Sequence, residues 1–334
     1  MLIVSYAPPC RGARLGDTIL RNRLFAALAI VPFLAAARPG MAWEEKGHRM
    51  ISRVAAESMP ADTPAFFKAA ASRLEYLGPE PDRWRSGAGP QLNAVNGPDH
   101  FIDMEPVVSA PLATDRYKFI ASIPTNAEAT KHKLTAEKIG FLPYRIAELT
   151  QTLQSEWRDW RKAKAEDKSQ IEQDIVYTAG VLGHYVADGS NPHHTTVHYN
   201  GWDEDYAPNP NGYTTAAAER DLKPNGFHHR FEGPFVVTNV EAKDIKPLVP
   251  QQKPVTNLLA DVWAYLKVTN AEVRPLYELE KAGAFKTGGT TDPKGLEFAR
   301  QRMAAGASML RDIWASAMAG VGRPRTAVKT DAGS

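Results

Sequence analysis

Histidines and carboxylates recur at helical spacing in this 334-residue chain. Eight of the nine histidines lie in four short clusters, each with an acidic residue nearby. In two clusters a histidine precedes a carboxylate by four positions, as His184 precedes Asp188 and His228 precedes Glu232. In a helix this spacing places both side chains on one face, one turn apart. Such a pair can bind a divalent metal ion or form an ordinary hydrogen bond within the helix.

A third histidine returns from the segment that follows the first pair. Gly189 and Pro192 predict that the helix ends after Asp188, and His194 follows Asp188 by six positions. The two remaining clusters are Asp99-His100-Phe101-Ile102-Asp103 and Trp43-Glu44-Glu45-Lys46-Gly47-His48. Nitrogen and oxygen ligands leave zinc, manganese and iron open, and zinc is the commonest choice for hydrolysis.

The first 42 residues have the pattern of a signal peptide. Two arginines precede an apolar run over 24–37, which is too short to span a bilayer, and small residues follow up to Ala42. We expect cleavage before Trp43 and export to the periplasm or beyond the cell; a buried N-terminal helix is the alternative. The leader holds the only cysteine, Cys10, and a net charge of +4, so the mature chain falls from +2 to −2. The side-chain ligands of any metal site in the mature chain must then be His, Asp and Glu.

The remaining sequence predicts an all-α protein with long loops. Alternation of Val, Ile and Tyr is scarce, whereas apolar residues recur at helical spacing in five segments: 47–57, 142–164, 171–188, 255–282 and 296–318. Two segments rich in Gly, Pro and Asn, 78–98 and 200–224, are predicted to be irregular. We expect one multi-helix domain over 43–322, a flexible tail over 323–334, and no membrane span after Trp43.

In their order along the chain, these motifs resemble those of the zinc-dependent phospholipase C/P1 nuclease superfamily. They are a tryptophan that becomes N-terminal on cleavage, Gly-His, Asp-x-x-Arg, His-Phe-x-Asp, His-x3-Asp-x5-His and His-x3-Glu, and they span Trp43 to Glu232. The resemblance implies an all-helical domain of that superfamily's type, with three zinc ions in a cleft. It implies these ligands: Trp43, His48 and Asp188 for one ion; Asp82, His100, His184 and the shared Asp188 for a second; His194, His228 and Glu232 for the third.

The resemblance also implies roles around the metal ions. Asp82 and Asp188 would be catalytic through the ions that they hold, and Arg85 would face the phosphate. Asp99 competes with Asp82 as the ligand, and Arg85 has the alternative of being a solvated loop arginine. In nucleases of the superfamily, the residues that resemble Phe101 and Asp103 stack on a base and read its edge. Here both are equally open to packing and helix-capping roles.

Three other histidines leave alternatives open. His193 and His229 each adjoin an implied ligand, although the spacing favours His194 and His228. His198 matches no template of the superfamily.

The substrate is less closely defined than the chemistry. The short interval from Trp43 to His48 resembles nucleases, whereas Glu232 and its Gly-Phe-His context resemble bacterial phospholipase C. We expect an exported phosphodiesterase with three zinc ions, acting preferably on nucleic acid. A phospholipase C acting on phospholipid is the first alternative, and a non-catalytic zinc-stabilised binding protein is the second. Neither resemblance implies a stable protein partner.

Overall fold

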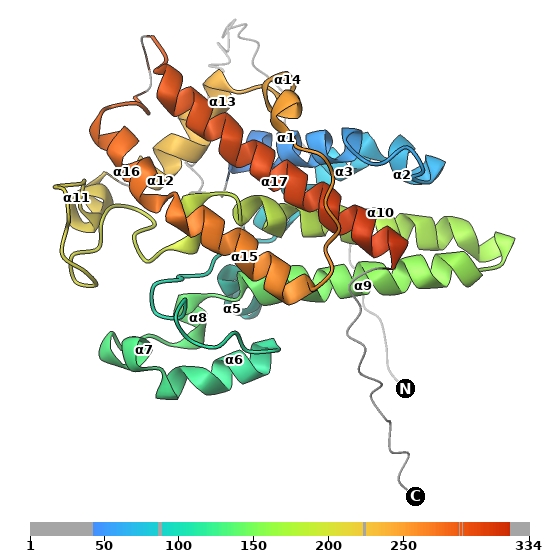
Figure 1. Ribbon diagram of the computed structural model, residues 1–334, viewed down its shortest axis with the longest axis horizontal. Coiled ribbons are helices and arrows are strands. Elements are labelled where there is room, and N and C mark those ends of the chain that lie inside the picture. Colours follow the sequence, from blue (N-terminus) through green and yellow to red (C-terminus); the bar gives the residue numbers. More distant parts are fainter. Residues whose placement is uncertain (1–42, 86–88, 223–224, 287, 289, 321–334) are drawn as a thin grey trace, which may run out of the picture. The chain divides into compact units, whose positions relative to one another are not determined.

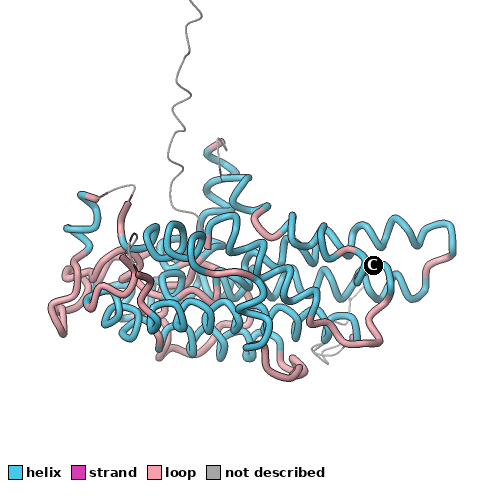
Figure 2. The backbone as a smooth tube through the Cα atoms, turned by 90° about the horizontal axis from the view of Figure 1, so that it is seen from above, coloured by secondary structure: helices cyan, strands magenta, loops and turns pink. Residues whose placement is uncertain are grey.

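The computed structural model describes residues 43–320 except 86–88, 223–224, 287 and 289. The predicted signal peptide with Cys10 and the predicted tail over 323–334 lie outside the described residues. Within the described part the chain forms helices, turns and loops, with no strand beyond two isolated bridges, Tyr199–Gly201 and Trp202–Thr215. Figures 1 and 2 show this organisation from two directions. The prediction of an all-α fold is therefore confirmed.

The longer helices form the frame. They are α1 (Glu44–Glu57), α9 (Leu142–Lys162), α10 (Ala165–Asp188), α15 (Leu258–Ala271), α16 (Val273–Lys281) and α17 (Pro293–Ala319). Helices α9 and α10 run side by side, and α17 crosses them (Figure 1). None of the described helices is both long and apolar enough to cross a membrane.

Shorter helices connect this frame and carry much of the candidate site. Those before α9 are α2 (Ala65–Ala69), α3 (Ala71–Leu77), α4 (Glu80–Arg85), α5 (Pro90–Asn96), the 3-10 turn η1 (Gly97–His100), α6 (Arg116–Ser122), η2 (Ile123–Thr125), α7 (Ala127–Lys131) and α8 (Ala136–Ile139). Those after α10 are η3 (Pro192–Thr195), α11 (Ala216–Asp221), α12 (Phe227–Arg230), the π-helical turn η4 (Phe231–Phe235), α13 (Val236–Asn239), α14 (Ala242–Ile245) and η5 (Lys246–Leu248).

Helix α10 occupies the centre, as its apolar sequence predicts. Every residue from Thr178 to Asp188 is buried, and α10 packs against α1, α3, α9 and α17. Gly180 allows the close approach of α3, because a β-carbon there would overlap the side chain of Leu77. The functional end of α10 is thus enclosed by neighbouring helices.

Two predictions about local structure were wrong. Segment 78–98 contains α4, α5 and the start of η1, because its Pro90 lies in the first turn of α5 and its Gly97 caps the end of that helix. These are positions where proline and glycine favour a helix boundary. The predicted helix over 255–282 is two helices that join at Glu272. Pro275 lacks the N–H that would bond back across this junction.

Candidate metal centre

Helix α10 contributes two side chains that face the same space. His184 and Asp188 are fully buried, and His184 Nε2 lies 3.3 Å from Asp188 Oδ2. The i,i+4 spacing therefore has the consequence expected for one face of a helix. Asp188 is the last residue of α10, and the chain turns away after it.

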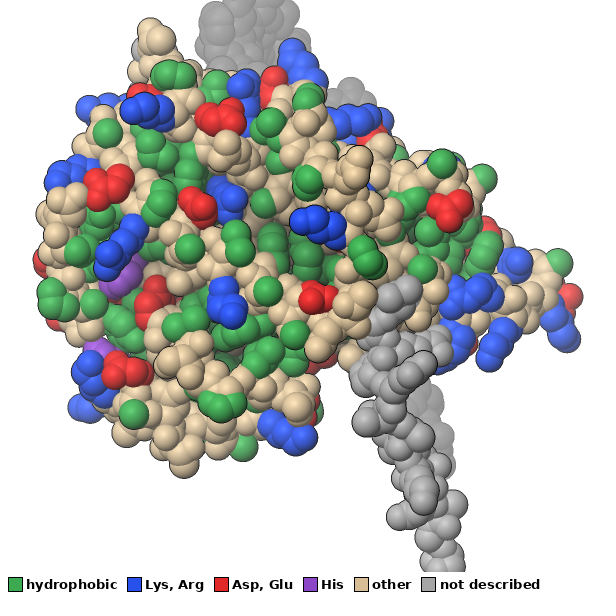
Figure 3. Space-filling view, in the orientation of Figure 1, with side chains coloured by type: hydrophobic (Ala, Val, Ile, Leu, Met, Phe, Trp, Pro, Cys, Tyr) green, Lys and Arg blue, Asp and Glu red, His purple; other side chains and the backbone are tan. Residues whose placement is uncertain are grey.

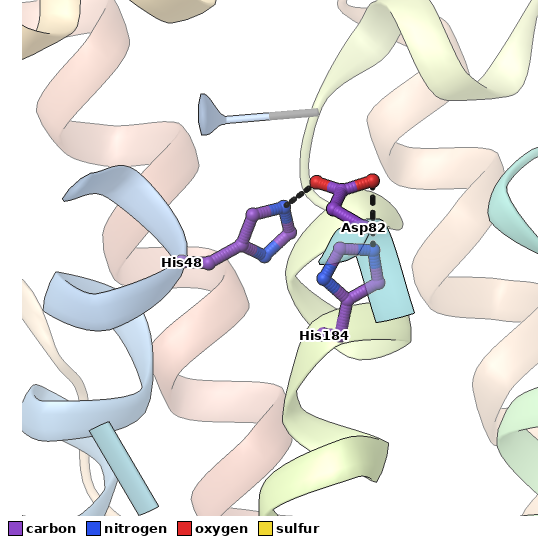
Figure 4. A group of neighbouring side chains, drawn as sticks. All are labelled: His48, Asp82 and His184. Atoms are coloured by element: carbon purple, nitrogen blue, oxygen red, sulfur yellow. Dashed lines mark ion pairs between the residues drawn. The ribbon is translucent and has the colours of Figure 1, made fainter. Parts of the chain in front are cut away.

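Three other elements bring side chains to this pair. His48 comes from α1, Asp82 from α4 and His100 from η1, and all are buried. Asp82 lies between two histidines, with Oδ2 3.9 Å from His48 Nε2 and Oδ1 3.8 Å from His184 Nε2 (Figure 4). His100 Nδ1 lies 2.9 Å from His184 Nε2. The donor atoms form two overlapping sets that can each surround an ion: His48, Asp82 and His184, and His100, His184 and Asp188.

The two oxygens of Asp188 face different histidines. Oδ1 lies 3.4 Å from His48 Nε2, and Oδ2 lies 3.1 Å from His100 Nδ1. A carboxylate can bind through both oxygens, whereas an imidazole presents one free lone pair. Asp188 is therefore placed to be shared between two ions.

A third set lies beyond the end of α10. His194 from η3, His228 from α12 and Glu232 from η4 bring their donor atoms together. His228 Nε2 lies 2.8 Å from Glu232 Oε2 and 3.2 Å from His194 Nε2. Glu232 stands in a π-helical turn that contains Pro234, a local irregularity often found at functional sites.

Backbone carbonyl groups fix the orientation of two of these histidines. His184 Nδ1 donates to the carbonyl oxygen of Gly78 at 2.9 Å, and His194 Nδ1 donates to that of His100 at 2.7 Å. A carbonyl only accepts, so Nδ1 carries the proton and Nε2 presents its lone pair to the cluster. This is the usual arrangement behind a metal-bound imidazole.

Several carboxylate oxygens of the cluster lack hydrogen-bond partners, as expected for groups that bind a cation. Among the described residues, both oxygens of Asp82, Oδ1 of Asp188 and Oε1 of Glu232 are buried with no hydrogen-bond partner. Without a cation, burial raises the pKa of Asp82 to about 7 and that of Glu232 to about 7. Burial of an unpaired charge is costly, and a divalent ion would supply the missing positive charge. The donor types, oxygen and imidazole nitrogen without sulfur, suit zinc.

Trp43 lies beside the third set. Its ring is fully buried, with Nε1 donating to the carbonyl oxygen of Ala187 at 2.9 Å and to Ser190 Oγ at 3.0 Å. Its backbone N–H donates to Glu232 Oε2 at 3.3 Å. The structure thus brings the Trp43 nitrogen to Glu232, while the resemblance groups it with His48 and Asp188.

The geometry separates the two candidate aspartates. Asp99 binds arginines instead of facing the histidines, with Oδ1 2.6 Å from Arg116 Nη1 and Oδ2 3.5 Å from Arg145 Nε. Asp82 lies inside the cluster. Of the two, only Asp82 is placed to contact an ion there.

Arg85 and His228 are the most exposed side chains at the cluster. Arg85 Nη1 lies 3.8 Å from Asp82 Oδ1, and the arginine side chain is 38% exposed. The His228 side chain is 19% exposed, whereas the other side chains of the three sets are almost fully buried. On the face shown in Figure 3, histidine side chains reach the surface only at one edge.

The two expected substrate-binding residues lie close to the cluster in sequence but have other contacts. Phe101 is half-buried, and its ring lies against the backbone at Gly140. The backbone N–H of Asp103 donates to the carbonyl oxygen of Ile139 at 2.7 Å. Burial and the nearby Glu105 and Asp203 raise the pKa of Asp103 well above its usual range. Substrate roles for both residues stay predictions.

The remaining histidines lie around the three sets or apart from them. The buried His193 stacks on His228, with ring centroids 4.7 Å apart. His229 Nδ1 lies 3.2 Å from Glu44 Oε1. His198 stacks on Trp202 and accepts a hydrogen bond at Nδ1 from the backbone of Asp203. The spacing argument therefore selected the two histidines, His194 and His228, whose nitrogens join the third set.

Sequence reasoning missed two asparagines that support this third set. Asn191 is buried, and its Nδ2 donates to Glu232 Oε2 at 3.1 Å. Asn200 Oδ1 accepts a hydrogen bond from the backbone N–H of His228 at 3.1 Å. Asn191 lies between Asp188 and His194 within the His-x3-Asp-x5-His motif, but only the folded structure shows its partner.

Comparison with known proteins gives little further guidance. No family model matches the chain, and no curated protein matches it. Among solved structures, the chain is similar to Clostridium perfringens alpha-toxin from an avian strain, with 14% identity and a TM-score of 0.34. The likeness covers 84% of this chain and 65% of the toxin chain, so this chain spans less than two thirds of the toxin's length. A TM-score this low carries no argument about the site or the activity.

Proposed function

We propose that this protein is an exported hydrolase of phosphate esters with three zinc ions. The observation that carries the proposal is the convergence of three His and carboxylate sets, with Asp188 placed between two of them. Buried carboxylate oxygens without hydrogen-bond partners support ions over a purely structural hydrogen-bonded cluster.

Zinc, when bound, supplies Lewis-acid activation of water and of a phosphoryl oxygen. The chain's own residues hold and orient the reacting groups. Asp82, Asp188 and Glu232 provide the negative charge that retains the ions, and backbone carbonyls fix the histidine rings. Arg85, at the exposed side, is placed to bind an anionic phosphoryl oxygen and to stabilise charge as it develops.

The proposed substrate is a phosphodiester, in nucleic acid or in a phospholipid head group. Nucleic acid is favoured by the Trp43-to-His48 spacing, and phospholipid by Glu232 and its context. No comparison supports the preference for nucleic acid, so the phospholipid alternative stands beside it. Both substrates contain a phosphodiester bond. Hydrolysis of a general phosphodiester is therefore the first activity to measure.

The decisive experiment measures hydrolysis of bis-p-nitrophenyl phosphate before chelation, after chelation and after zinc is restored. We expect activity that is lost with the metal and regained with zinc. Single-stranded DNA and phosphatidylcholine vesicles, assayed in parallel, then distinguish the two substrates. Zinc retained without turnover of any of these would favour the non-catalytic binding protein, and protein purified without metal would contradict the proposal altogether.

A further inference from the structure

The backbone is strained where the chain enters α1. Among the described residues, only Trp43, Glu44 and Lys133 combine a side chain with a positive φ angle. Trp43 and Glu44 are consecutive, with φ angles of 48° and 38°. Such conformations persist only where surrounding contacts determine them. The positive φ angle of Glu44 exists whether or not the residues before Trp43 are removed, so the contacts around Glu44 must determine it.

Two anchors hold the strained segment from opposite directions. The buried Trp43 indole is hydrogen-bonded to the end of α10 through Ala187 and Ser190. The Glu44 carboxylate instead contacts the segment α12–η4, where its Oε1 lies at ion-pair distance, 3.2 Å, from His229 Nδ1 without hydrogen-bond geometry. The bent backbone between these anchors directs the Trp43 N–H at Glu232 Oε2.

Gly233 provides the space for this arrangement. It follows Glu232 in η4, and the Glu44 carboxylate lies directly over it. A β-carbon at Gly233 would fall 2.6 Å from Glu44 Cδ and closer still to Oε1. Alanine at this position would therefore displace the Glu44 side chain from its contact with His229.

We propose that Glu44, seated over Gly233 and paired with His229, is a positioning residue that holds the Trp43 backbone nitrogen against Glu232 in the metal centre. This inference rests on the proposed metal-dependent function. In the intact chain the nitrogen is a peptide N–H that orients the Glu232 carboxylate. After the predicted cleavage an amine would stand at the same place. Glu44 touches no metal donor itself and acts through Trp43 and Glu232.

The test compares zinc affinity, by competition with a chelator, in wild type and in variants of the purified protein. Glu44→Ala should weaken one of the bound ions about 10- to 100-fold, the usual effect of losing an outer partner of a metal ligand. Gly233→Ala should do the same. Glu44→Gln retains an oxygen for His229 and should keep most of the affinity.

The double variant separates the specific contact from general damage. Once Glu44 is alanine, the β-carbon at Gly233 has no carboxylate to displace, so Gly233→Ala should add little further loss. Such non-additivity is the signature of a direct interaction. Two independent losses that add fully would overturn the inference.

Glu45→Ala is the matched control. Glu45 also lies in the first turn of α1, but it pairs with Arg49 and Arg83 away from η4. Both acidic residues favour the helix start to a similar extent, so a defect confined to Glu44 isolates the positioning contact. Thermal melting of the metal-free variants checks folding, which matters most for Gly233→Ala, because a β-carbon before Pro234 disfavours the helical conformation.

The outcomes separate this inference from the proposed function. Wild-type protein without bound metal would overturn both. Wild-type protein with zinc, together with unchanged affinity in Glu44→Ala and Gly233→Ala, would overturn the positioning role alone. Equal losses in Glu44→Ala and Glu45→Ala would overturn it as well.

Discussion

Asp188 follows His184 by one turn of α10, and its Oδ2 lies 3.3 Å from His184 Nε2 while its Oδ1 is directed at another helix. The two residues are neighbours by local geometry alone, yet the second oxygen reaches a histidine from a distant part of the chain. Asp188 thus contacts histidines from three separate elements, α1, η1 and α10.

Asp188→Asn should therefore disturb two ions at once. The amide keeps the shape of the side chain but removes its charge and weakens one oxygen as a ligand. We expect loss or loosening of two zinc ions and a fall in turnover greater than about 10³-fold, because loss of a single stabilising group typically costs about 10²–10³. Elemental analysis and the phosphodiesterase rate provide the measurement.

His194→Ala is the control and should weaken binding of the third ion alone. If Asp188→Asn loses at most one ion and keeps near-normal turnover, Asp188 is not shared between two ions.

Arg85→Ala should reduce turnover without emptying the site. The Arg85 guanidinium is exposed beside Asp82 and is proposed to bind the phosphoryl group instead of the metal. We expect about a 10²–10³-fold lower kcat with unchanged zinc content. Arg83→Ala is the control, since Arg83 pairs with Glu80 and lies over the Tyr76 ring. If the two variants have the same activity, Arg85 is a surface arginine.

The position of the first residue should affect metal binding. A chain that begins at Trp43 presents an amine near Glu232, whereas a longer chain presents a peptide nitrogen that cannot serve as a metal ligand. We expect the chain beginning at Trp43 to hold its full complement of zinc more tightly than a chain that retains the residues before it. Parallel zinc titrations of both forms make the comparison. Equal affinity and equal activity would show that the Trp43 nitrogen is not a ligand.

Glu156 gives a pH-dependent prediction away from the metal centre. Burial raises the pKa of Glu156 from 4.5 to about 7 in the folded state. The hydrogen bond that Thr178 Oγ1 donates to the carboxylate opposes this rise only in part. The folded chain then binds more protons than the unfolded chain between these values, so stability falls as pH rises from about 4.5 through 7. Glu156→Gln should be more stable than wild type at pH above about 7 and similar at about pH 4, below both pKa values. Urea denaturation of metal-free protein at both pH values tests this, with the exposed Glu166→Gln expected to show no such difference.

The sequence could predict what depends on local spacing. Four of the five predicted long helices, the pair His184 and Asp188, and the pair His228 and Glu232 follow from helical periodicity, and the structure contains them. The choice between Asp82 and Asp99 could not be made in this way, because neither stands at helical spacing from an implied histidine ligand. The difference between them appears only in the folded chain, where Asp99 contacts arginines and Asp82 lies among the histidines.

Contacts between distant segments also could not be predicted from the sequence. Trp43 and Glu232 are 189 positions apart, and no local pattern relates them. The π-helical turn at Glu232 depends on how Pro234 is accommodated by neighbouring helices, and proline alone predicts a break. The segment over 78–98 was predicted to be irregular because composition does not show whether glycine and proline fall inside a helix or at its ends.

With ions bound, the three sets of ligands would also act as cross-links in a chain whose described residues contain no cysteine. An ion between His48 and His184 would close a loop of about 136 residues, and one between His194 and Glu232 a loop of about 38. Since closure entropy grows only with the logarithm of loop length, these closures differ by about 1 kcal/mol. The short link would thus restrict the chain almost as strongly as the long ones, and loss of any one ion would loosen it to a similar degree.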